Sequence, residues 1–345
     1  MNYKRTKLDD TVSERVIGTH SGSFQADEAM GVWMLRQTPE YRCSKCVRSR
    51  DLKVLDTLDI VIDVGGVYDH AKKRYDHHQR DYDERFDSGK KNSDGRCTKL
   101  SASGLVYRHY GKDVIRAYYP SLTGETLDLV YNKMYNTLLE ALDAIDTGVE
   151  MAPTGVELLY RDATGLSSRV GRLNPRWNEE DSTGNPIDMD ERFEAASKIC
   201  GEDFMDVLTK IVESDLPARD FVEQAVLERK EVDPSGEIIK FHSGGLPWKN
   251  YLYEFEKKHT VDPLIKYVLY TDQAAMWRVQ AVTVEGKAFE NRLSLPEEWR
   301  GLRDSELVSV TAIPGSRFVH AGGFIAGNDS FEGALEMARV ALTRN

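Results

Sequence analysis

Short apolar runs alternate with longer segments of helical periodicity in the first half of the chain. Residues 15–20 and 58–64 are rich in β-branched side chains, and the second run stops at Gly65 and Gly66, which is typical of buried strands. Segments with apolar residues at helical spacing are 26–36, 101–117 and 124–148. Strands that alternate with helices in this order predict an α/β fold with a parallel sheet.

The second half has a different pattern. Residues 171–190 are rich in turn formers and predict a surface connection. Helical spacing then resumes at 190–213 and 217–231. Three expected strands come next, at 237–242, 265–270 and 276–284, and an expected final helix at 330–343 ends the chain. This order predicts a smaller α+β domain with a mainly antiparallel sheet.

Length and charge narrow the classes of function. A chain of 345 residues accommodates two domains, and a net charge of −11 argues against nucleic-acid binding by bulk electrostatics. A nucleic-acid site would need a local basic cleft or bound metal ions. No apolar run approaches the roughly 20 residues of a membrane span, and residues 1–10 are too polar for a secretory signal. The four cysteines make no disulfide framework and are expected to be reduced intracellular thiols.

Three consecutive metal-competent side chains, Asp76, His77 and His78, follow an expected strand. Alternate residues of a strand point to opposite faces, so the three cannot all bind one ion directly. We expect His77 to bind a metal, Asp76 to orient it, and His78 to reach substrate. Taken alone, the tripeptide is weak evidence and fits a solvated polar loop better.

Other acidic and histidine residues lie next to expected strands or on an expected helix. His20 and Asp27 flank the loop after the first strand, and Asp63 ends the second. Ligands of open α/β sheets gather at the carboxyl ends of strands. Asp143 and Asp146 share one face of an expected helix, three residues apart. Each acid alone fits a helix cap or surface charge, but together the segments predict one polar pocket.

These segments resemble the DHH phosphoesterase superfamily and, within it, the melanocyte-proliferating-gene (Myg) exonuclease family. The resemblance runs from about residue 16 to the C-terminus. Its matching stretches are GTHSGSF at 18–24, DEA at 27–29, DVGG at 63–66, YDHHQR at 75–80, TKLSASGL at 98–105, DAID at 143–146, 169–177, LPAR at 216–219, VDPSGE at 232–237, YTDQ at 270–273 and HAGGFIAG at 320–327.

The resemblance implies a DHH-type parallel-sheet catalytic domain over 15–190, a helical linker over 191–214, and a substrate-binding domain over 215–345. It also implies two divalent ions, Mn²⁺ or Mg²⁺, that promote hydrolysis of a phosphodiester. The implied ligands are His20, Asp27, Asp63, His77 and one or both of Asp143 and Asp146. His78 is expected to contact the scissile phosphate.

One position departs from the family pattern, because Gln25 stands where the family has histidine. An amide is a poorer metal ligand than imidazole. We therefore expect one under-occupied metal site and a chain that folds, binds RNA and cleaves it poorly. A change in this lineage and an engineered substitution both fit this departure.

Two further groups are candidates for substrate binding. Arg169, Arg172, Arg176 and Trp177 combine basic side chains with an aromatic on which bases stack; a solvated turn with Trp177 buried at a domain junction is the alternative. The loop with Arg317, His320, Gly322 and Gly323 resembles the glycine-rich substrate loop of DHH exonucleases. Lys249 is a weaker candidate.

The combined pattern predicts a 3′–5′ exoribonuclease that acts on single-stranded RNA and has no membrane partner. The alternatives are a phosphatase or phosphodiesterase of small nucleotides and a catalytically degenerate RNA-binding protein. The resemblance implies an intracellular protein with mitochondrial and nuclear populations, although no targeting segment is evident in this chain.

Overall fold

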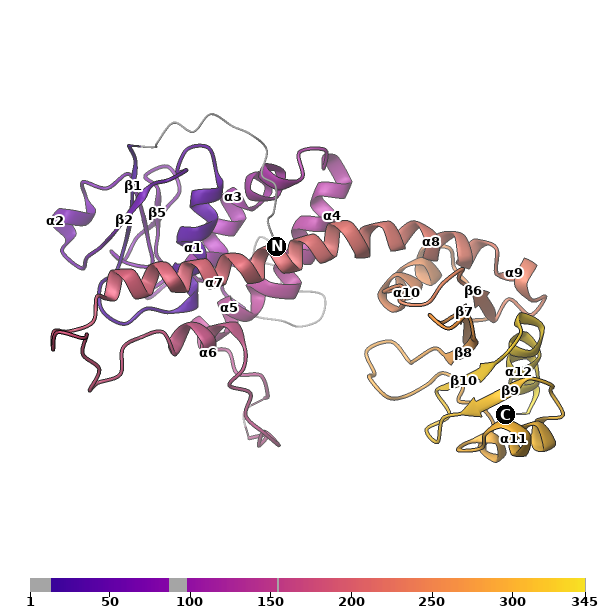
Figure 1. Cartoon of the computed structure of the whole chain (residues 1–345). Helices are drawn as coiled ribbons and strands as arrows, with labels where there is room; N and C mark the ends of the chain where they lie inside the picture. The colour runs from indigo at the N-terminus through magenta and orange to yellow at the C-terminus, as the bar shows by residue number, and fades with distance from the viewer. Residues whose placement is uncertain (1–13, 87–97, 154, 345) are drawn as a thin grey trace. The chain divides into compact units, whose positions relative to one another are not determined.

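The computed structural model describes residues 14–86, 98–153 and 155–344 (Figure 1). The polar segment 1–10 and Cys97 lie outside these ranges. The chain divides into two compact units, one ending at Ile211 and the other beginning at Val212. Each unit is described by itself below.

The sheet of the first unit has the strand order β2-β1-β3-β5-β4. Its strands are β1 (Val16–Thr19), β2 (Lys45–Arg48), β3 (Ile60–Ile62), β4 (Tyr68–Asp69) and β5 (Arg74–Tyr75). The first four strands in the order are parallel, and β4 pairs antiparallel with β5 at the edge. β3 is buried along its length, as its β-branched composition predicts. The α/β class expected from the sequence is confirmed, with one antiparallel edge strand added.

Three long helices pack beside this sheet: α1 (Ala26–Gln37), α3 (Ala102–Tyr118) and α7 (Met189–Thr209). α1 packs against both α3 and α7 (Figure 1). Gly201 of α7 is required at this contact, because a Cβ there would collide with the indole of Trp33. The segment 191–214, expected as a linker, is helical, but its larger part is α7 and packs in the first unit.

Shorter helices complete the first unit: α2 (Leu52–Leu55), α4 (Gly124–Met134), α5 (Glu140–Asp146) and α6 (Leu166–Gly171). The single helix expected over 124–148 is interrupted by a π-helical turn at Tyr135–Leu139, between α4 and α5. A π turn contains one residue more than an α turn, so it changes which side chains face the sheet beyond it. A further π-helical turn, Lys210–Asp215, follows α7.

The second unit contains a five-stranded sheet of order β6-β7-β8-β10-β9. Its strands are β6 (Ile238–Lys240), β7 (Tyr267–Thr271), β8 (Trp277–Ala281), β9 (Ser316–Val319) and β10 (Ile325–Asn328). β6 and β7 are parallel and all other pairs are antiparallel. The helices are α8 (Leu216–Leu227), α9 (Arg229–Val232), α10 (Lys249–Lys258), α11 (Asp304–Thr311), α12 (Phe331–Thr343) and a short 3-10 turn, Glu297–Trp299.

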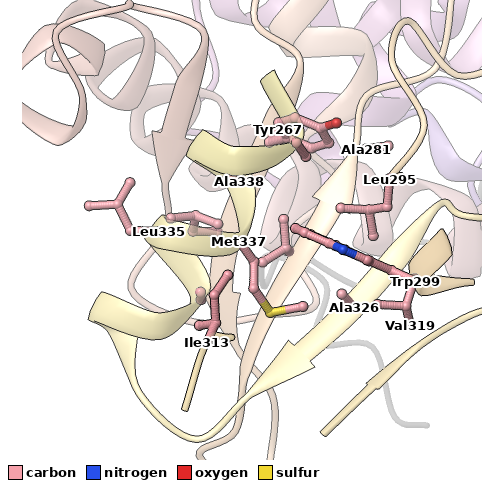
Figure 2. Packing of buried hydrophobic residues seen from close by; sticks show 14 of the residues in the cluster. Tyr267, Ala281, Leu295, Trp299, Ile313, Val319, Ala326, Leu335, Met337 and Ala338 are labelled. Atoms are coloured by element: carbon pink, nitrogen blue, oxygen red, sulfur yellow. The ribbon is translucent and has the colours of Figure 1, made fainter. Parts of the chain in front are cut away.

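Hydrophobic cores lie on both faces of β7 in this second sheet. Tyr267 of β7 packs with Trp299 and Met337 in one core (Figure 2). The next residue, Val268, belongs to the opposite core together with Leu252 of α10. Successive strand residues thus serve opposite faces, as the two-residue period of a strand requires.

In the part of the chain that the structure describes, no helix combines the length and apolar character needed to span a bilayer.

Candidate metal centre

The functional candidates of the first unit lie at the carboxyl ends of three adjacent parallel strands. His20 directly follows β1, Asp63 directly follows β3, and Asp76 directly follows β5. Because β1, β3 and β5 are neighbours in the sheet, these residues lie at one edge. Asp27 reaches the same place from the first turn of α1.

One cluster consists of Asp27, Asp63, His77 and Asp146, whose ligand atoms all lie within 4.8 Å of one another. Nε2 of His77 lies 2.9 Å from Oδ2 of Asp146 and 3.2 Å from Oδ1 of Asp63. All four side chains are buried or nearly so. The sequence expectation that these segments converge is therefore met by the geometry.

A second cluster consists of His20, Glu28 and Asp63. Nε2 of His20 lies 3.0 Å from Oε1 of Glu28 and 3.4 Å from Oδ2 of Asp63. Oδ1 of Asp63 faces His77 and Oδ2 faces His20, so Asp63 belongs to both clusters. Asp63 also belongs to a third group, with Asp76, His77 and His78, and this group overlaps the first cluster at His77. Sequence reasoning missed Glu28, because an acid in the first turn of a helix is ordinarily a dipole or capping residue. Its adjacency to Asp27 was the one available indication.

The backbone at Asp63 is strained. Asp63 has φ of +58°, in the left-handed region, and Gly65 and Gly66 that follow also have positive φ. A non-glycine residue held in this region costs about 1–3 kcal/mol and is often found at functional sites. Here the sharp turn after β3 directs the carboxylate between His20 and His77.

The electrostatics of the two clusters favour a bound cation. Burial alone lowers the pKa of both His20 and His77, but hydrogen bonds with the surrounding carboxylates outweigh it and raise each pKa to about 10. Burial raises the pKa of Asp27, with the neighbouring Asp146 and Asp63 adding to the shift. Without metal, the protons on the two imidazoles and the tendency of Asp27 to keep its own proton offset part of the charge of the four carboxylates. A divalent cation would displace these protons and take over their role.

The chemistry of the donors fits divalent metal ions. Imidazole nitrogens and carboxylate oxygens are ligands of Mn²⁺ and related ions. Nδ1 of His20 lies 3.2 Å from the carbonyl oxygen of Ser21 and 3.2 Å from the guanidinium of Arg50. When Nδ1 donates to that carbonyl, Nε2 is left unprotonated as a ligand atom. The residues present therefore fit a metal centre.

The Asp76–His77–His78 segment differs in one detail from the expectation. Asp76 orients the ring of His78 rather than that of His77. Its Oδ1 lies 2.6 Å from Nδ1 of His78 and accepts the backbone N–H groups of both histidines, but it has no hydrogen bond with the ring of His77. The other oxygen of Asp76 accepts the N–H of Gly66. The side chain of His78 is 62% exposed, so it is accessible to a ligand while its ring is held by Asp76.

The structure separates Asp143 from Asp146. Asp146 faces His77, whereas Asp143 is fully buried beneath the centre and accepts hydrogen bonds from Ser101 and from Tyr135 (2.8 Å). The hydroxyl of Ser101 also contacts Asp27. Burial raises the pKa of Asp143 to about 7. Asp143 is thus placed to support Asp27 through Ser101.

The N-terminus of α3 holds Asp27 in position. Oδ2 of Asp27 accepts the N–H of Ala102 at 3.0 Å, and Oδ1 accepts that of Ser103 at 2.7 Å. Unpaired N–H groups at a helix N-terminus are well suited to a carboxylate. The sequence around residue 101 matches the family pattern, but only the structure shows that its backbone holds the carboxylate of Asp27.

Gln25 precedes α1, and its side chain is exposed. Its side chain forms no hydrogen bond with a side chain of either cluster among the described residues. Gln25 and Glu28 instead form a capping box, in which the Gln25 side chain accepts the backbone N–H of Glu28 and the backbone N–H of Gln25 donates to Oε1 of Glu28 at 2.9 Å. The expectation that residue 25 acts in the centre as a ligand thus has no contact to support it.

The basic segment of the first unit is anchored beside this region. Asn174 exchanges two hydrogen bonds with the backbone of Phe24, at 3.0 and 2.8 Å. Arg169 is occupied by Asp203, and Arg172 donates to the carbonyl of Ala163. Arg176 lies 3.5 Å from Glu179 and is largely exposed, and Trp177 is 97% exposed.

In the second unit, the glycine-rich loop adjoins a pocket. Gly322 and Lys249 line it together with the exposed rings of Phe289 and Phe324. Nδ1 of His320 accepts the N–H of Gly322 at 3.0 Å, and its ring contacts Phe324. Gly323 has φ of +65° and lies close to Arg300.

Arg317 is not among the residues that line this pocket. Its guanidinium is paired with Asp329 at 2.7 Å and with Asp304 at 3.5 Å. Two carboxylates thus already compensate the charge that was expected to hold a phosphate.

Together, the fold and the two clusters define an α/β protein with a His–carboxylate centre suited to divalent cations. Residues 16–342 match the model MYG1_exonuc, described as "Uncharacterised protein family (UPF0160)". The chain belongs to this family. It is 45% identical to the MYG1 exonuclease of Rattus norvegicus, over 95% of this chain and 84% of that protein. It is 44% identical to the MYG1 exonuclease of Homo sapiens (95% and 86%) and 41% identical to the MYG1 protein of Dictyostelium discoideum (97% and 98%).

Proposed function

We propose that the chain is a metal-dependent exonuclease of the DHH phosphoesterase type that hydrolyses single-stranded RNA from its 3′ end. The observation that carries the proposal is the pair of clusters joined by Asp63, whose side chains are of the kinds that bind metal ions. We propose that each of the two clusters holds one ion. Paired cations are a recurring device for phosphodiester hydrolysis. The name exonuclease of the rat and human relatives supports the same class of reaction.

The proposed ligands are His20, Asp27, Asp63, His77 and Asp146. Bound Mn²⁺ or Mg²⁺ ions would supply positive charge for the phosphate and lower the pKa of bound water. We also propose that His78 donates a hydrogen bond to a phosphate oxygen of the substrate. Its contact with Asp76 and its exposed side chain support this role.

Binding of the RNA strand is assigned to exposed groups of each unit. In the first unit these are Arg176 and Trp177, which offer a cation and an aromatic surface for base stacking. In the second unit they are Lys249, Gly322 and the rings of Phe289 and Phe324. Such local features bind nucleic acid in a chain whose net charge is −11.

The test is hydrolysis of one single-stranded RNA labelled at either end, beside a DNA of the same sequence and a dinucleotide, with Mn²⁺ or Mg²⁺. A 3′–5′ exonuclease shortens the 5′-labelled strand stepwise and releases the 3′ label at once. D63N is the matched control, because it removes charge from both clusters, and it should abolish cleavage.

Other outcomes of the same assay would replace the proposal. Cleavage confined to the dinucleotide would indicate a small-nucleotide phosphodiesterase, and RNA binding without cleavage in any metal would indicate an RNA-binding protein. A ladder of products from the 3′-labelled strand would refute the direction. We also expect mitochondrial and nuclear populations, which cell fractionation tests.

A further inference from the structure

Glu28 is a buried carboxylate with one unsatisfied oxygen. The residue is 0% exposed and lies in the first turn of α1. Its Oε1 contacts Nε2 of His20 and accepts the N–H of Gln25. Its Oε2 is buried and has no hydrogen-bond partner among the described residues. A buried carboxylate oxygen without a partner is costly, so the site calls for a further positive group.

The distances around His20 suit a coordinated cation. With metal–ligand distances of about 2.1 Å, neighbouring ligand atoms in octahedral or tetrahedral geometry are separated by about 3.0–3.4 Å. The two oxygens nearest to Nε2 of His20 lie at 3.0 Å, from Glu28, and at 3.4 Å, from Asp63. Three side chains of the right type thus already occupy positions close to those of ligands of one ion.

We propose that Glu28 is the third protein ligand of the cation held by His20 and Asp63, and that the side chain of Gln25 is not a ligand. This inference rests on the proposed function only in requiring a divalent cation at the centre. Gln25 contributes instead as the N-cap of α1: its side chain accepts the backbone N–H of Glu28, and its backbone N–H holds Oε1 of Glu28 at 2.9 Å. The departure at Gln25 is then compatible with two fully formed sites.

The competing explanation gives Glu28 a structural role only, as a helix cap that also holds His20. E28Q separates the two explanations, because an amide oxygen still accepts the N–H of Gln25 and fills the same volume. The amide is a poor ligand for a divalent ion. A structural role therefore predicts unchanged metal binding in E28Q, and the ligand role predicts loss at one site.

The experiment is titration of the full chain with Mn²⁺ alone, with free Mn²⁺ followed by electron paramagnetic resonance. The wild type should bind two ions. E28Q should bind one ion as before and the second at least 10–100-fold more weakly, while the melting temperature of the metal-free protein changes little. Q25A and Q25H, the matched controls, should retain both affinities.

Three results would overturn the inference: two wild-type affinities in E28Q, loss of a site in Q25A, or a tenfold gain in Q25H. If E28Q does not fold, as judged by circular dichroism, E28D is used, since it keeps the charge but withdraws the oxygens, and the same loss at one site is required. Two bound ions without RNA cleavage would refute the proposed function and leave this inference standing. A wild type that binds no Mn²⁺ would refute both.

Discussion

Gly104 lies in the first turn of α3, directly against the carboxylate of Asp143. A Cβ at this position would lie 2.7 Å from Cγ of Asp143 and closer still to both oxygens. Carbon atoms in good contact are about 3.5–4.0 Å apart. The substitution G104A therefore forces Asp143 to retreat by about 1 Å or α3 to move by the same amount.

The cost follows from the bonds that the retreat breaks. Asp143 accepts the N–H of Ser101 at 3.0 Å, its hydroxyl at 2.6 Å, and the hydroxyl of Tyr135 at 2.8 Å. Losing one or two of these bonds costs about 1.5–6 kcal/mol, since bonds to charged groups are worth about 1.5–3 kcal/mol each. Alanine regains about 1 kcal/mol of helix propensity. The net loss is about 0.5–5 kcal/mol, or a melting temperature lower by about 1–20 °C for a unit of this size.

The assay is thermal and urea unfolding of G104A, followed by Mn²⁺ titration. The control is G171A, because a Cβ at residue 171 meets nothing within 4 Å. G171A should be as stable as the wild type or slightly more so. G104A should also bind Mn²⁺ more weakly, because Asp143 and Asp27 share the hydroxyl of Ser101. Wild-type stability and metal affinity in G104A would refute this account of the support beneath the centre.

Three further predictions follow from the same geometry. D146N should lose Mn²⁺ affinity by at least tenfold, whereas D143N should mainly alter stability; equal metal affinities in D146N and the wild type would show that Asp146 is no ligand. Burial raises the pKa of Asp143 to about 7 in the folded protein. The contribution of Asp143 to the free energy of unfolding is therefore fully present below about pH 4, and it falls by about 1.4 kcal/mol per pH unit as the pH rises to 7. The difference in unfolding free energy between metal-free wild type and D143N should show that slope. H320A should weaken RNA binding more than R317A, because Arg317 is already paired with two aspartates; the reverse order of affinities in a filter-binding assay would contradict this.

Much of the first unit could be predicted from local patterns. The β-branched runs at β1 and β3 and the helical spacing of α1, α3 and α7 are strong because each has a buried face. The elements without a prediction have weaker patterns. β4 has only two residues, and β9 and β10 carry Arg317 and Gly327, which interrupt a simple apolar alternation. Tertiary pairing rather than local preference places such strands in a sheet.

The residues of the metal centre, too, could be predicted only in part from the sequence. Residue types and strand ends identified His20, Asp27, Asp63 and His77, because the carboxyl ends of neighbouring parallel strands meet at one edge. The direction of each side chain at that edge depends on the turn after the strand. The left-handed conformation of Asp63 has no local signature in a non-glycine residue, and Asp76 turned out to hold His78.

Sequence by itself determined the class of fold, the order of the elements and most of the residues that converge. Only the tertiary structure distinguished Asp146, which faces His77, from Asp143, which is buried against Ser101, and placed Glu28 beside His20. The two aspartates lie three residues apart on one helix face, so periodicity gives them nearly the same direction. The π-helical turn at Tyr135–Leu139 rotates α5 relative to α4. That rotation, set by packing, directs Asp146 to His77 and Asp143 into the interior against Gly104.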